Sequence, residues 1–107
     1  MESAPLSEPV LLILLSLAQQ PKHGYAILGD VETMSSGRVV LSTGTLYGAL
    51  RRLLDQAWIE RCADDDTSRG KQSYRLTPTG RRNLQLEVGR MKHLARLASS
   101  RLAQEEG

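Results

Sequence analysis

The last third of the chain limits the fold more than any other feature. Thr77 and Pro78 are a typical helix start, and no later proline interrupts the sequence before the terminal Gly107. A helix over residues 78–107 would extend roughly 40 Å at 1.5 Å per residue. The residues before it can form a body only ~25–30 Å across. A single body of that size cannot cover the whole helix, so the helix needs a partner.

Apolar residues recur along this helix at alternating spacings of four and three, the heptad pattern of paired helices. A first helix, expected to begin at Ser7-Glu8-Pro9, is apolar on more than one face, which is typical of a helix buried on two sides. Together the two helices predict a homodimer. Its predicted interface consists of Leu11, Leu12, Leu15, Leu84, Val88, Met91, Leu94, Ala95, Ala98 and Leu102.

Three shorter elements and a hairpin are expected between these helices. A second helix should open at His23-Gly24 and close at Ser35-Ser36-Gly37, with Gly37 as a left-handed cap. Val39-Val40-Leu41 is prone to form a short strand. Ser42 reads as the N-cap of a third helix that runs to about Gln56. Residues 57–62 and 72–76 predict two strands, and Asp64 to Gly70 would be the loop between them.

The order helix, helix, short strand, helix, hairpin, long helix predicts a mainly α fold with a small β-hairpin: a winged helix-turn-helix with a long C-terminal dimerisation helix. Residues 1–77 would form the DNA-binding part, with residues 57–76 as its wing. Residues 78–107 would form the dimerisation helix of the same structural unit.

Charge and composition exclude several other classes of protein. The net charge is only +2, but five cations and no acid lie between Arg69 and Arg82. Charge alone fits a solvated surface about as well as a polyanion site. The single Cys62 and the distant His23 and His93 cannot close a metal site, and they have no partners spaced for hydrolytic catalysis. We therefore expect no metal, cofactor or enzymatic activity, and a cytoplasmic protein without a membrane segment.

The third helix carries the most specific pattern in the chain. Residues 41–53, LSTGTLYGALRRL, closely resemble the recognition segment L-S-x-G-T-L-Y-x-x-L-x-R-L of the PadR-like (phenolic-acid-repressor-like) transcriptional regulators. Further landmarks agree in order, among them His23-Gly24-Tyr25, Trp58-Ile59-Glu60 and Arg69-Gly70-Lys71. The resemblance covers about residues 8 to 98 and is to the smaller subfamily, without an extended C-terminal domain. Ala57 departs from it, because members often carry Gly before the Trp.

The resemblance and the exposed face of the third helix together predict the DNA-binding residues. They are Ser42, Thr43, Gly44, Thr45, Tyr47, Gly48, Arg51, Arg52, Arg69, Lys71 and Arg75. Tyr47 and Arg51, one turn apart, are expected nearest the bases. The hydroxyls of Thr43 and Thr45 fit a capping role almost as well, and Arg52 fits an ion pair with Asp55 equally well.

These patterns predict a sequence-specific regulator of transcription that binds duplex DNA, most simply a homodimeric repressor on an inverted-repeat operator. A response to a small hydrophobic effector is left open. Because the only tryptophan, Trp58, lies on the wing, an aromatic stacking site at the seam is not expected. The alternative is a winged-helix module that binds a protein, which would require an uncharged face on the third helix.

Overall fold

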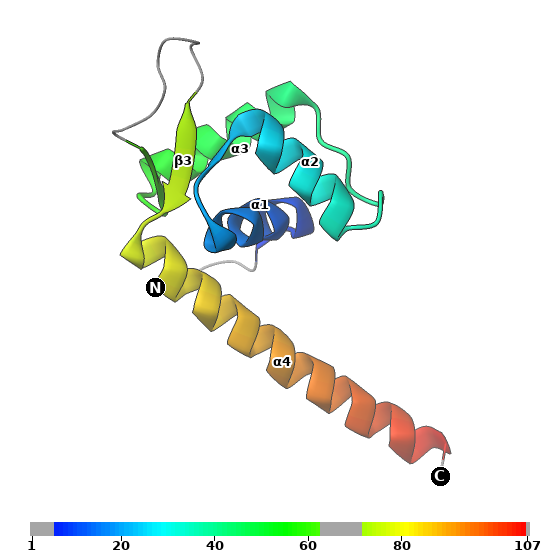
Figure 1. Cartoon of the computed structure of the whole chain (residues 1–107). Helices are drawn as coiled ribbons and strands as arrows, with labels where there is room; N and C mark the ends of the chain where they lie inside the picture. The colour runs from blue at the N-terminus through cyan, green and yellow to red at the C-terminus, as the bar shows by residue number, and fades with distance from the viewer. Residues whose placement is uncertain (1–5, 63–71, 107) are drawn as a thin grey trace.

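A computed structural model describes residues 6–62 and 72–106 of the chain (Figure 1). The elements follow in the order α1 (Glu8–Gln19), β1 (Lys22–His23), α2 (Gly24–Met34), α3 (Thr43–Asp55), β2 (Ile59–Arg61), β3 (Ser73–Leu76) and α4 (Pro78–Glu106). The predicted mainly α fold with a small sheet and a long C-terminal helix is confirmed. Figure 1 shows α1, α2, α3 and the strands gathered into one body, from which α4 projects alone.

Local capping chemistry sets the helix boundaries. The Ser7 side chain accepts a hydrogen bond from the Val10 N–H and caps α1, and Ser42 caps α3 by accepting from the Thr45 N–H at 3.1 Å. Gly37 follows α2 with φ at +83°, as predicted for a left-handed cap. Because these caps use only neighbouring residues, the sequence predicted the helix starts to within a residue.

Aliphatic side chains from α1, α2 and α3 form the core. Leucine and isoleucine dominate it, in a chain that has one Trp, three Tyr and no Phe. Its most deeply buried members are Ile13, Leu14, Leu17, Ile27, Leu46, Leu50, Ile59 and Val31. One face of α3 packs against this core, and the opposite face of α3 is exposed to solvent.

The strand predicted at Val39-Val40-Leu41 is wrong: these residues connect α2 to α3 without pairing in the sheet. The Ser35 hydroxyl supplies the hydrogen bonds that a neighbouring strand would otherwise give to Val39. It accepts a hydrogen bond from the Val39 N–H at 2.9 Å and donates one to the Val39 carbonyl at 3.4 Å. The third strand is β1, which pairs antiparallel with β3 on the side opposite β2. The Lys22 ammonium in β1 reaches the Ser16 carbonyl at 2.5 Å, tying this strand to the end of α1.

A single threonine joins the end of α3 to the start of α4. The Thr77 hydroxyl donates to the Ala57 carbonyl at 2.6 Å and accepts from the Gly80 N–H at 2.9 Å. The Thr77 N–H also donates to the Trp58 carbonyl at 3.0 Å. A Cβ on Gly80 would lie only 2.0 Å from the Trp58 carbonyl oxygen. The first turn of α4 is therefore held directly against the corner that follows α3.

The one departure from the family pattern noted in the sequence, Ala57, lies at this corner. Ala57 has φ at +63°, in the left-handed region, and its N–H donates to the Leu54 carbonyl. The Trp58 N–H donates to the Leu53 carbonyl. These two bonds form a Schellman motif, in which the residue at the Ala57 position is usually glycine.

We expect Ala57→Gly to raise the free energy of unfolding by about 0.5–1 kcal/mol, because glycine adopts this conformation without a Cβ clash. Ala26→Gly is the matched control: Ala26 is an exposed residue within α2, where the same substitution should cost about 1 kcal/mol. Urea denaturation at one fixed protein concentration measures both. A loss of stability in Ala57→Gly would contradict the strained conformation.

Candidate nucleic-acid interface

One side of α3 is buried and the other is open, which defines a candidate surface for a ligand. Leu46, Ala49, Leu50 and Leu53 point into the core, and Leu54 is half-buried. On the outer side, Arg51 is exposed and the Tyr47 side chain is 41% exposed. The outward face predicted from the sequence therefore matches the one in the structure.

Glycine at positions 44 and 48 of this surface is not explained by internal packing. A Cβ on Gly44 would meet no atom within 4 Å. A Cβ on Gly48 would meet only a guanidinium nitrogen of Arg52, at 4.0 Å. Glycine in a helix costs about 1 kcal/mol relative to alanine. The protein thus carries two unfavourable residues on a surface that a ligand can approach closely.

The hydroxyls at the start of α3 are partly occupied within the chain. The Ser42 hydroxyl accepts from the Thr45 N–H and donates to the Thr45 hydroxyl at 3.0 Å. Capping therefore accounts for Ser42 and engages Thr45, which is one of the two roles the sequence left open. Thr43 is exposed at the first position of the helix.

The Tyr47 side chain is held in place by a glycine from α2. A Cβ on Gly24 would lie 2.2 Å from the Tyr47 hydroxyl oxygen and 2.8 Å from the ring carbon that carries it. The tyrosine ring therefore extends over the beginning of α2 at a distance that only glycine permits. This contact places the Tyr47 hydroxyl at the start of α2.

Between α3 and the hairpin lies a small hollow of about 90 Å³. Its lining consists of Tyr47, Leu50, Arg51, Leu54, Arg61 and Tyr74. Arg61 was not among the residues predicted from the sequence. It pairs with Tyr74 across the sheet, on the face that carries the buried Ile59 and Leu76. Alternation along β2 would have placed Arg61 on the Ile59 face, but only the register brings it beside Arg51.

The remaining predicted cations have different surroundings. Arg52 is exposed, and among the described residues no carboxylate pairs with it, so the ion pair with Asp55 is not formed. Arg75 forms an ion pair with Glu60 at 2.7 Å on the outer face of the hairpin. Arg69 and Lys71 lie outside the described residues.

The predicted dimer residues divide into two groups. Leu12 and Leu84 are buried in the chain's own core, and Leu11, Leu15 and Val88 are half-buried against it. The remaining residues lie on the projecting part of α4 and are exposed to solvent. These are Met91, Leu94, Ala95, Ala98 and Leu102.

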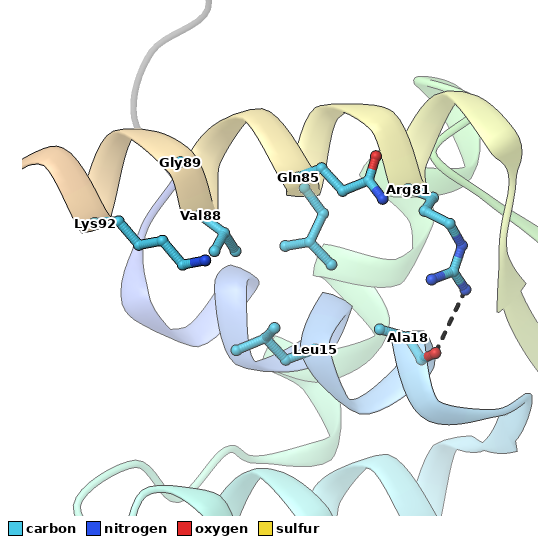
Figure 2. A pocket seen from close by; sticks show the side chains of 8 residues that line it. Leu15, Ala18, Arg81, Gln85, Val88, Gly89 and Lys92 are labelled. Atoms are coloured by element: carbon cyan, nitrogen blue, oxygen red, sulfur yellow. Dashed lines mark hydrogen bonds between the residues drawn. The ribbon is translucent and has the colours of Figure 1, made fainter.

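A groove of about 380 Å³ separates α1 from the first half of α4 (Figure 2). Leu15 and Ala18 line it from α1, and Leu84 and Val88 line it from α4. Arg81 closes one end, where its guanidinium donates to the Ala18 carbonyl at 3.4 Å, while Lys92 lies at the other. The exposed apolar residues that begin at Met91 follow Leu84 and Val88 at heptad spacing along the same face of α4.

The described residues bring together no group of three side chains able to hold a metal ion. In the same part of the chain, no helix is both long and apolar enough to cross a membrane. On α4, the hydrogen bond that Arg90 donates to Glu87 lowers the pKa of Glu87 below its usual value and raises the pKa of Arg90. That pair is remote from the α3 surface.

Residues 13–86 match the model of the Transcriptional regulator PadR-like family. A curated relative, an uncharacterized 37.1 kDa protein in a transposon of Streptomyces fradiae, is 38% identical over 86 residues, which are 79% of this chain. The aligned region covers only 23% of that longer protein.

Solved structures reproduce the fold. A PadR family transcription regulator from Clostridium difficile superposes with a TM-score of 0.73 at 22% identity, over 90% of this chain and 99% of the other. Bacillus subtilis PadR, solved in complex with operator DNA, superposes with a TM-score of 0.61 at 21% identity, over 71% of this chain and 44% of the other.

Proposed function

Because the chain belongs to the PadR-like family of transcriptional regulators, we propose that it binds duplex DNA as a homodimer and represses transcription by occluding a promoter. The family is one of regulators and not of enzymes. The proposal extends to an inverted-repeat operator and a cytoplasmic location. The observation that carries DNA binding is the outer face of α3, where Tyr47 and Arg51 stand beside two glycines that the fold does not require.

This face suits the major groove. The groove is about 12 Å wide and accepts a helix of 10–12 Å diameter only if the helix approaches closely. Gly44 and Gly48 remove side-chain bulk on the approaching side, while Arg51 can reach base edges with its planar donor group. A protein-binding winged helix would need an uncharged face here, and the exposed Arg51 and Arg52 argue against it.

Gly48→Ala separates stability from binding. We expect the substitution to raise the free energy of unfolding by about 1 kcal/mol, because alanine favours the helix. It should weaken duplex binding by about tenfold or more, the equivalent of roughly 1.4 kcal/mol, because the added methyl group holds α3 away from the groove. Urea denaturation and fluorescence anisotropy measure the two effects, on duplexes selected by sequencing the fragments that the purified protein retains.

Gly29→Ala is the matched control, since Gly29 is exposed within α2 and a Cβ there would meet nothing within 4 Å. It should stabilise the protein without changing DNA affinity. If Gly48→Ala bound DNA as tightly as wild type, α3 would not be the recognition helix that enters the major groove. If wild type retained no duplex at all, the protein-binding alternative would replace the proposal.

The projecting half of α4 supports the homodimer. Its apolar residues from Met91 to Leu102 have no cover in the single chain, and the groove beside α1 lies at the end of the same line. We assign the groove to a second copy, because a two-fold axis would lay the exposed seam of each chain against the groove and seam of the other. A small hydrophobic effector, if the regulator responds to one, belongs in our proposal to this same apolar surface.

A charge in the seam should prevent pairing, because an unpaired carboxylate buried between apolar helices is strongly disfavoured. We therefore expect Met91→Glu and Leu94→Glu to give monomers or aggregates by sedimentation velocity at micromolar concentration. Leu86→Glu is the control, since Leu86 is 66% exposed and lies roughly 140° around α4 from Met91. It should leave the dimer intact. A wild-type chain that sediments as a monomer would contradict the proposal.

A further inference from the structure

We infer that the hollow between α3 and the hairpin binds one phosphate group of the DNA backbone, and that Arg61 contacts this phosphate from the hairpin side. This inference rests on the proposed function and adds to it a residue and a ligand group. The hollow is the space of about 90 Å³ that Tyr47, Arg51, Arg61 and Tyr74 line together with two leucines.

The residues that line the hollow favour an anion as its ligand. Two guanidinium groups face the hollow from two separate elements, and none of its lining residues is acidic. The nearest carboxylate along β2, that of Glu60, is turned to the other face of the sheet and is engaged by Arg75 at 2.7 Å. Within residues 6–62 and 72–106, no carboxylate forms an ion pair with Arg51 or Arg61. Arginine binds phosphate oxygens with two parallel hydrogen bonds, which fits this arrangement.

The size of the hollow selects a small group. Sites for drug-sized molecules measure about 300–1,000 Å³, several times the volume available here. A single phosphate is therefore a better fit than an organic effector. Two of its lining residues, Leu50 and Tyr74, are buried in the protein, at 1% and 5% exposed.

The position of the hollow selects the DNA backbone over a base edge. Positions 47, 50, 51 and 54 share the flank of α3 that faces the hairpin. A helix fills the width of the major groove, so an element beside the helix, such as the hairpin that carries Arg61, meets the sugar–phosphate strand, whereas Arg51 on α3 itself can still reach a base edge. Arg61, which approaches from the hairpin, therefore meets a phosphate when α3 is in the groove.

Arg61→Ala tests this by the salt dependence of binding. The slope of log affinity against log salt should become shallower by about 0.9 for each bound protomer. At one fixed salt concentration the affinity should fall about tenfold, equally on a selected duplex and on an unrelated one, because phosphate contacts do not depend on sequence. Arg61→Lys should keep the wild-type slope, since it retains the charge. Arg96→Ala, on an exposed face of α4 away from the seam, should behave as wild type.

If the salt-dependence slope of Arg61→Ala is unchanged while wild type still binds DNA, the hollow is not a phosphate site. The proposed function is not affected by that result. A loss on the selected duplex alone also overturns the phosphate site, because Arg61 would then read a base. A test with inorganic phosphate distinguishes a phosphate of the DNA backbone from a free phosphate ion as the group that the hollow binds. Stabilisation of wild type but not of Arg61→Ala by millimolar phosphate at matched ionic strength, with no change in the DNA slope, would assign the hollow to a free anion. Failure of wild type to bind any duplex would instead refute the proposed function itself.

Discussion

The bond from the Thr77 hydroxyl to the Ala57 carbonyl connects the two working parts of this regulator. Ala57 lies in the turn directly after α3, and Thr77 caps α4, so one side chain joins the proposed recognition helix to the proposed dimerisation helix. Gly80 in the first turn of α4 lies so close to the Trp58 carbonyl that any side chain there would clash with it. The direction in which α4 leaves the body is therefore set by the same residues that terminate α3. In a dimer built on α4, this junction would transmit the two-fold symmetry of the helix pair directly to the two α3 surfaces.

Stability and function have separate demands in this chain. The aliphatic core holds α1, α2 and α3 together without help from α4 beyond its first turns, where Leu84 is 5% exposed. The outer face of α3 keeps two glycines that weaken its helix, and Ala57 retains a backbone conformation that glycine would adopt more easily. The glycines have a reason if DNA approaches α3 closely. The structure offers no corresponding reason for Ala57.

Sequence reasoning succeeded where the determining interactions are local. Ser7 and Ser42 cap the helices that their positions predicted, and α4 follows Thr77 as the Thr77-Pro78 pair predicted. It failed where pairing joins distant segments: β1 was missed, because Lys22 and His23 pair with residues some 50 positions later. Arg61 was missed for the same reason, since only the register of β2 against β3 places it beside Arg51. The predicted seam remains a prediction, and its first members, Leu84 and Val88, pack against the chain's own core, which spacing alone cannot reveal.

Hydroxyl-radical footprinting of a selected duplex tests most directly whether a dimer presents two α3 helices to DNA. If the junction at Thr77 fixes both helices about one two-fold axis, protection should fall on two inverted half-sites. Their centres should lie one helical turn apart, about 34 Å or ~10 base pairs, or a whole multiple of that. A single protected half-site, or two half-sites in direct repeat, would contradict the arrangement.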